Sequence, residues 1–268
     1  YLRFLSPPLH RQIILFCTLD HPDDKLVPLV LAAGTARDIG AASVGLVSPY
    51  LAYMRQDRRF KTGEAVSSAQ FARILSREFD WLVTVDPHLH RRTSLAEIYA
   101  IPAAATHAGR LIGRWVRETI PSPLLVGPDE ESEQWVSDVA GEAGAPSTVL
   151  RKVRYGDRDV RIMLPRLDPW RDRIPVLVDD IISTGRTMIE ASRLLVESGM
   201  PPPVCVAVHG IFAGNAFDEL IDAGVAGIAT VNTVPHTSNV IDATHILSGE
   251  VRQMLQRICP MTDTSSTI

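Results

Sequence analysis

Two adjacent carboxylates and a short run of hydroxyl residues follow one apolar segment of the chain. Asp179 and Asp180 end the apolar run Ile174 to Val178. The loop that follows contains Ser183, Thr184, Gly185, Arg186 and Thr187. A loop of this composition at a helix start presents backbone N–H groups and the positive end of the helix dipole, which suits an anion. The carboxylates would repel a phosphate, so they suit sugar hydroxyl groups. The segment therefore predicts a sugar-phosphate site, and a strand turning into a helix with a hydroxyl N-cap is the alternative.

The apolar segments around this site indicate buried parallel strands, because they are continuously apolar rather than alternating. The predicted strands are Gln12 to Cys17, Ser43 to Ser48, Trp81 to Val85, Pro123 to Gly127, Pro175 to Asp179, Val204 to His209 and Gly227 to Asn232. The predicted helices are Lys25–Ile39, Val66–Phe79, Arg110–Thr119, Glu131–Ala143, Thr187–Ser198 and Ala216–Ala223. This alternation predicts a doubly wound α/β fold with ligands at the carboxyl ends of the strands.

The order of elements is roughly repeated, with a junction near Ala103 to Gly109. We therefore expect an N-terminal domain at residues 1–106, a second domain at 107–258 that carries the sugar-phosphate loop, and a tail at 259–268. The chain begins at Tyr1 without a methionine, inside an apolar run. This predicts that a natural N-terminal segment is missing.

Composition limits the classes of partner. The 268 residues carry a formal net charge of −4, which argues against a general nucleic-acid binder. No apolar run approaches the roughly 20 residues that span a bilayer, so no membrane partner is expected. Cys17, Cys205 and Cys259 stand far apart outside any metal motif, which predicts reduced thiols and a cytoplasmic setting.

Two further strand ends carry polar residues. Arg55, Gln56 and Asp57 lie in a loop after a predicted strand, and the planar Arg55 fork suits a polyphosphate. A solvated charged turn is the alternative. His88 and His90 follow another strand, and such a pair also opens the sites of barrel-type metal-dependent hydrolases. That interpretation needs further ligands after later strands, and His209 completes no coherent set.

The segment Leu150 to Ile162 is dense in charge and has no hydrophobic periodicity, so it predicts a mobile loop or an exposed hairpin. It contains Lys152 and Arg154. A loop with two cations can close over reacting phosphates and supply charge where it builds up. A solvated charge cluster is the alternative.

Six ordered motifs carry a family resemblance. VDDIISTGRT resembles the phosphoribosyl-binding loop that type I phosphoribosyltransferases share with ribose-phosphate pyrophosphokinases. The other five resemble segments of the pyrophosphokinases: PYLAYMRQDRRFKTGEAVSS (49–68), TVDPHLH (84–90), GPDEESEQWV (127–136), VHGIFAG (208–214) and NTVPH (232–236). Plain phosphoribosyltransferases lack the RQD segment, so the resemblance favours the pyrophosphokinase family.

The resemblance implies two phosphoribosyltransferase-like, doubly wound domains with mostly parallel sheets, related by internal duplication. It also implies transfer of diphosphate from Mg-ATP to the 1-hydroxyl of ribose 5-phosphate, which gives phosphoribosyl pyrophosphate and AMP. The expected cofactor is Mg²⁺, and a homo-oligomer is expected by analogy. The implied ligands of ATP are Arg55, Gln56, Asp57 and His88; those of the metal are His88 and Asp129; the catalytic cations are Lys152 and Arg154.

The chain departs from the family pattern at Ser183, where an acid is usual, and at Arg186, where a glycine is usual. Glu130 and Glu131 also replace glycines. These departures leave open a non-catalytic regulatory homologue and a phosphoribosyltransferase. The presence of Lys152, Arg154, His88 and the two aspartates argues against the first, because a non-catalytic protein has no need of the catalytic loop. A phosphoribosyltransferase would require a nucleobase-recognising hood, and none is found.

Overall fold

The computed structural model describes residues 1–129, 132–155, 159–163 and 167–258. The chain forms two compact units. Unit 1 combines Tyr1–Thr106 with the C-terminal segment that begins at Thr244, and unit 2 comprises His107–Ala243.

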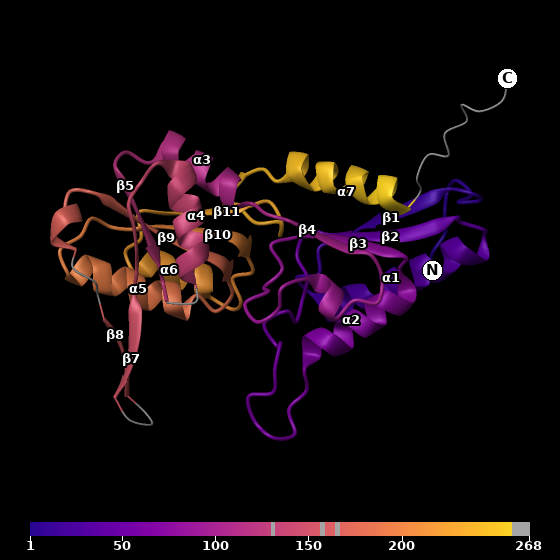
Figure 1. Ribbon diagram of the computed structural model, residues 1–268, viewed down its shortest axis with the longest axis horizontal. Helices are drawn as coiled ribbons and strands as arrows, with labels where there is room; N and C mark the ends of the chain where they lie inside the picture. Colours follow the sequence, from indigo (N-terminus) through magenta and orange to yellow (C-terminus); the bar gives the residue numbers. More distant parts are fainter. Residues whose placement is uncertain (130–131, 156–158, 164–166, 259–268) are drawn as a thin grey trace. The chain divides into compact units, whose positions relative to one another are not determined.

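Unit 1 is built on four parallel strands in the order β1-β2-β3-β4. Helices α1 and α2 lie on one face of this sheet and α7 lies on the other, where it contacts β3 and β4 (Figure 1). The core lies between the sheet and the first two helices, around Leu46, Leu82 and Phe71. The bounds are β1 Gln12–Phe16, α1 Pro22–Asp38, β2 Ser43–Ser48, α2 Ser67–Glu78, β3 Trp81–Val85, the 3₁₀ turn η1 Leu95–Glu97, β4 Ala103–Thr106 and α7 Thr244–Ile258.

A glycine in β2 makes room for the largest buried side chain of unit 1. Trp81 of β3 is fully buried, and a Cβ atom at Gly45 would lie 1.9 Å from its ring. A buried indole has no space to move. We therefore expect Gly45→Ala to lower the free energy of unfolding by about 1–3 kcal/mol, measured by urea denaturation. Gly141→Ala is the control, since no atom lies within 4 Å of the added carbon. Equal stability of the two variants would contradict the prediction.

Unit 2 is built on six parallel strands in the order β12-β11-β10-β9-β5-β6. The chain moves outward from β5 to β6, then from β9 through β10 to β12 in the opposite direction. The strand order thus reverses between β5 and β9, and ligands bind at the carboxyl ends of strands beside such a switch point. The bounds are α3 Gly109–Thr119, β5 Pro123–Gly127, α4 Glu133–Ala143, β6 Ser147–Val149, the 3₁₀ turn η3 Asp168–Trp170, β9 Ile174–Ile182, α5 Arg186–Glu197, β10 Val204–Gly210, α6 Ala216–Asp222, β11 Gly227–Val231 and β12 Asn239–Ile241.

Helices α3 and α4 cover one face of this sheet, and α5 and α6 cover the other (Figure 1). The core around α5 includes Leu124, Leu177 and Leu195. Between β6 and β9, the charged segment forms an antiparallel hairpin of β7 Arg151–Tyr155 and β8 Asp159–Met163. Of the two predicted forms of this segment, the structure shows the hairpin.

All seven predicted strands and all six predicted helices are present, and both large sheets are parallel, which confirms the expected α/β class. The expected division into domains differs from the structure at one element. The sequence placed residues 107–258 together, whereas α7 packs on β3 and β4 and so belongs to unit 1. The expected tail, 259–268, lies outside the described residues. Within the described chain, none of the helices combines the length and apolar character that crossing a bilayer requires.

Candidate functional site

The hydroxyl-rich loop of unit 2 joins β9 to α5, as predicted. Gly185 is the N-cap residue of α5 and has φ +68°, a conformation that glycine adopts without steric cost. Within the described residues no side chain caps α5, so its first N–H groups remain available to an anion. The carbonyls of Ile182 and Ser183 accept N–H groups of residues 211–213. These bonds fix the loop against the segment that follows β10.

The two acids lie within β9 itself, shortly before its last residue, Ile182. Asp179 pairs with Ala207 of β10, and both carboxylates are half-buried. The N–H of Asp180 donates to Oδ1 of Asp179 at 2.9 Å. Burial, and next the negative charge of Asp180, raise the pKa of Asp179 well above its ordinary value, and the charge of Asp129 acts in the same direction. The site therefore holds more negative charge than it can stabilise alone.

The raised pKa of Asp179 predicts a pH-dependent cost to folding. The folded state favours the protonated carboxyl, so stability is complete below the pKa of the unfolded chain and is lost as the pH rises through the folded pKa. We expect Asp179→Asn to raise the melting temperature at pH 7, with the gain disappearing near pH 4. Thermal unfolding in chelator without ligands measures this. The exposed Asp172→Asn should show no such gain, and a pH-independent effect of Asp179→Asn would contradict the assignment.

Asp129 belongs to the same region of unit 2. It follows β5, and its carbonyl accepts the Ser132 hydroxyl at 2.6 Å and the Ser132 N–H at 3.2 Å. This turn leads into α4. Glu130 and Glu131, the residues that depart from the family pattern, lie outside the described residues. The predicted catalytic cations lie on β7, where Lys152 pairs with Ile162 and Arg154 with Val160.

In unit 1, the predicted ATP residues occupy two loops at the carboxyl ends of β2 and β3. Arg55 and Gln56 are exposed, whereas the Asp57 side chain is 2% exposed and pairs with Arg91 at 3.2 Å. The structure therefore presents the first two side chains to solvent and turns the third inward.

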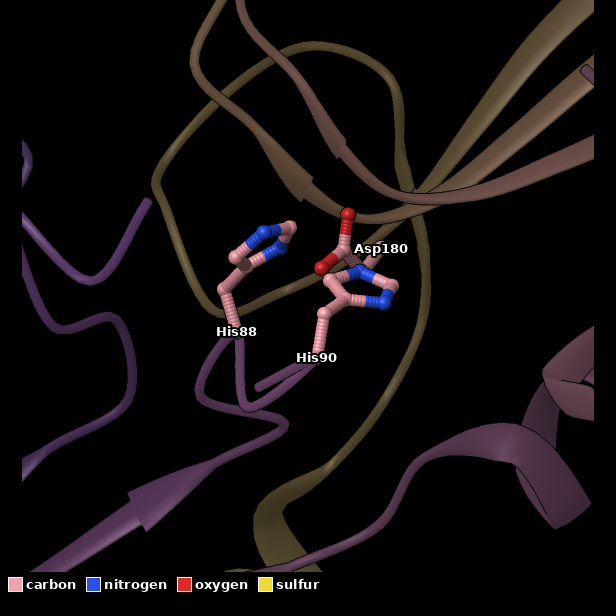
Figure 2. A group of neighbouring side chains, drawn as sticks. All are labelled: His88, His90 and Asp180. Carbon is pink, nitrogen blue, oxygen red and sulfur yellow. The ribbon is translucent and has the colours of Figure 1, made fainter. Parts of the chain in front are cut away.

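His88 and His90 follow β3 on the second of these loops. Figure 2 shows the two imidazoles beside each other, with ring centroids 4.0 Å apart in an edge-on arrangement. Asp86, which is buried and has φ +34°, begins the turn that leads to them. Its N–H donates to the carbonyl of Thr106, the last residue of β4, at 3.0 Å. The turn thus holds His88 half-buried and His90 exposed at the end of the sheet.

The motifs VHGIFAG and NTVPH pack together in unit 2. His209 is buried, and its Nδ1 lies 2.8 Å from the Thr233 hydroxyl, which donates to the Val208 carbonyl. The His236 ring lies 4.4 Å from the Phe212 ring, and burial lowers the pKa of His236. His209 therefore joins β10 to the loop that follows β11, which is a structural role and does not support the hydrolase alternative.

Comparison with known proteins agrees with this arrangement. Residues 9–78 match the N-terminal domain of ribose phosphate pyrophosphokinase, and residues 94–245 match the phosphoribosyl transferase domain. The ribose-phosphate pyrophosphokinase of Saccharolobus solfataricus is 35% identical over 239 residues, which cover 87% of this chain and 80% of that protein. The chain belongs to the ribose-phosphate pyrophosphokinase family. The enzyme of the same name from Methanopyrus kandleri is 34% identical over 235 residues, covering 87% of this chain and 79% of that one.

A solved structure shows the family fold. The phosphoribosylpyrophosphate synthetase of Mycobacterium smegmatis superposes with a TM-score of 0.80 at 20% identity, over 96% of this chain and 87% of that one. This likeness confirms the expected fold of phosphoribosyltransferase-like domains with parallel sheets. The internal duplication stays a prediction.

Sequence reasoning missed the residues that hold the two loops of unit 1. Arg91, Arg92 and Ser68 contact the segment at 56–57, and none was among the expected site residues. The paired arginines directly after a histidine pair were the available signal. Their partner could not be found from the sequence, because it lies 34 positions away.

Proposed function

We propose that the chain transfers the terminal diphosphoryl group of Mg-ATP to the 1-hydroxyl of ribose 5-phosphate. The observation that carries this proposal is the acid pair on β9 beside the uncapped start of α5, in a chain of the pyrophosphokinase family. The hydroxyl oxygen attacks the β-phosphorus of ATP, the bond from that phosphorus to the α-phosphate oxygen breaks, and AMP leaves. The hydroxyl proton is released.

The roles of unit 2 follow from charge and geometry. The 5-phosphate accepts N–H groups at the start of α5, with the hydroxyls of Thr184 and Thr187 and the guanidinium of Arg186 at hand. Ser183 and Gly185 complete this loop, with Gly185 supplying its positive φ. The ribose hydroxyls donate to Asp179 and Asp180, which satisfies carboxylates that otherwise crowd one another.

The proposed ATP ligands are Arg55, Gln56 and His88 of unit 1. Magnesium prefers oxygen ligands, and the carboxylate of Asp129 fits this preference, since it already adds to the negative charge around Asp179. His88 is better suited to a phosphate or to a metal-bound water. When bound, the ion neutralises phosphate charge. Lys152 and Arg154 then stabilise the charge that develops on the transferred group.

Phosphorus NMR of the chain with Mg²⁺, ATP and ribose 5-phosphate tests the proposal. We expect AMP and phosphoribosyl pyrophosphate to appear in equal amounts, without ADP. Binding of ribose 5-phosphate in a calorimeter without any turnover would instead support a non-catalytic homologue. Consumption of added phosphoribosyl pyrophosphate with a nucleobase would support a phosphoribosyltransferase.

The proposal includes a homo-oligomer, and one surface of unit 1 supports it. Twelve of the fifteen exposed large hydrophobic residues in the described chain lie in unit 1. Val27 and Leu31 of α1 are 62% and 57% exposed, and Ile74 of α2 is 40% exposed. A cavity of about 300 Å³ lies between the two helices, lined in part by Tyr53 and Phe71. A helix that is apolar on its outer side as well as its inner side is expected to be buried on both.

Charge makes this surface complementary to a second copy of itself. Asp23 and Asp24 begin α1, while Arg73 and Arg77 are exposed on α2, so a two-fold pair sets acids against bases. We expect light scattering to show a dimer or a larger even assembly and Leu31→Asp to halve its mass. Ile221→Asp, at an equally exposed site in unit 2, should leave the mass unchanged. A monomeric wild-type chain would contradict this part of the proposal.

ATP and ribose 5-phosphate are the proposed partners, and no nucleic acid is proposed. The cytoplasmic setting stays a prediction from the cysteines.

A further inference from the structure

We propose that Arg91 and Arg92 form a clamp between the two loops of unit 1 that carry the ATP ligands, and that Asp57 is a positioning residue of this clamp rather than a ligand of ATP. The inference rests on the proposed function, because it takes ATP as the ligand of Arg55 and Gln56. It assigns a role to two residues that the motif resemblance does not cover.

The first arm of the clamp is an ion pair. Nη1 of Arg91 lies 3.2 Å from Oδ2 and 3.3 Å from Oδ1 of Asp57. The Asp57 side chain is 2% exposed, while that of Arg91 is 34% exposed. A buried carboxylate must be compensated, and loss of the Arg91 guanidinium would remove a cation that pairs with this charge in the interior. The inward orientation of Asp57 also keeps its carboxylate away from the phosphates of a nucleotide, which it would repel.

The second arm holds the backbone of the same segment. Nη2 of Arg92 donates to the Asp57 carbonyl at 3.1 Å, and its Nη1 donates to the Ser68 hydroxyl at 3.1 Å. Ser68 is fully buried near the start of α2, and its hydroxyl and N–H both donate to the Gln56 carbonyl, at 3.0 Å and 3.2 Å. The carbonyls of Gln56 and Asp57 are therefore both fixed, one by α2 and one by the loop after β3.

This arrangement fixes a backbone while it leaves the adjacent side chains exposed. Arg55 and Gln56 are exposed to solvent, but they extend from a backbone segment whose carbonyl groups are hydrogen-bonded. The two side chains therefore have fixed points of attachment. His88 lies three residues before Arg91 on the loop that supplies both arms. The clamp thus sets the position of Arg55 and Gln56 relative to His88. A polyphosphate requires these three side chains to keep their relative positions, because displacement of a binding group by about 1 Å can lower the rate by roughly 100-fold.

The contact geometry selects the variants. Both hydrogen bonds from Arg91 to the Asp57 carboxylate come from one nitrogen, Nη1. A lysine ammonium can therefore replace the guanidinium, whereas a glutamine cannot supply the charge. We expect Arg91→Gln to raise the KM for ATP by about 10- to 100-fold. We expect Arg91→Lys to remain within about threefold of the wild type. The KM for ribose 5-phosphate should stay unchanged in both. A general loss of folding would instead lower the maximal rate and leave both KM values unchanged.

A double-mutant cycle tests whether Asp57 acts through Arg91. If it does, Asp57→Asn combined with Arg91→Gln should lose no more ATP affinity than Arg91→Gln alone. Additive losses would show that Asp57 contacts ATP directly and would overturn its assignment as a positioning residue. Arg252→Gln, an exposed arginine on α7, is the matched control and should behave as the wild type.

Calorimetric titration of Mg-ATP in the absence of ribose 5-phosphate separates this inference from the proposed function. If the wild-type chain binds ATP in this titration but shows no turnover when both substrates are present, the proposed reaction fails. Loss of ATP affinity in Arg91→Gln would then still support the clamp. If the wild type turns over and Arg91→Gln keeps its ATP affinity, the clamp is wrong and the reaction stands. A wild-type chain that does not bind ATP would overturn both.

Discussion

Lys152→Ala is expected to lower the turnover number by about 10²–10³-fold, because it removes a cation that acts where charge builds up in the transition state. Lys152 lies in β7 of a hairpin beside the six-stranded sheet, and Arg154 lies two positions further along the same strand. A group that acts chiefly in the transition state contributes little to substrate affinity. The KM values for ATP and ribose 5-phosphate should therefore change much less than the turnover number. Initial rates of AMP formation at saturating substrates measure the effect.

The hairpin also offers a control for this prediction. Arg161 of β8 pairs with Val153, between the two proposed catalytic residues, and has no assigned role. Arg161→Ala changes the local charge by the same amount as Lys152→Ala. It should leave turnover within about threefold of the wild type, because Arg161 has no proposed contact with the reacting phosphates. An unchanged turnover number in Lys152→Ala would contradict the catalytic assignment. An equal fall of the turnover number in both variants would mean that only the total charge of the hairpin matters.

The fold was predictable where strands are long and buried. Runs such as Ser43–Ser48 and Trp81–Val85 are mostly apolar and do not alternate with polar residues, since helices cover both faces of a parallel strand. The strands that sequence reasoning missed have three or four residues: β4 is an alanine-rich AAAT segment, and β6 and β12 lie at the edges of the unit 2 sheet. Such segments do not show a period. The packing of α7 on β3 and β4 could not be predicted for a different reason: the residues that directly precede α7 in the chain belong to unit 2.

The site, too, was predictable from the sequence only where its residues lie close together in the chain. The sugar-phosphate loop was predictable because its acids, its hydroxyls and the helix start lie within ten positions, so chain connectivity alone brings them together. The inward orientation of Asp57 was not, because it depends on Arg91 in another loop. The raised pKa of Asp179 also required the structure, since burial is its largest cause. Adjacent acids in a sequence do not reveal which of them is desolvated.

Asp180→Ala is expected to raise the KM for ribose 5-phosphate by about 10- to 100-fold, because a hydrogen bond to a charged group contributes about 1.5–3 kcal/mol. Asp180 is half-buried on β9 beside Asp179. Its N–H donates to the Asp179 carboxylate, and burial raises the pKa of Asp179. We therefore test Asp180 as the acceptor of the ribose hydroxyls.

The same change should leave the KM for ATP close to that of the wild type, because Asp180 is assigned to the ribose hydroxyls and not to the nucleotide. Removing one of two neighbouring negative charges should also lower the pKa of Asp179, since the charge of Asp180 is one of the causes that raise it. The stabilisation that Asp179→Asn brings at pH 7 should therefore shrink when Asp180 is alanine. Asp172→Ala, at an exposed position of unit 2, supplies the control for both measurements. A rise in the KM for ATP equal to that for ribose 5-phosphate would show that Asp180 serves the metal or the nucleotide instead of the sugar.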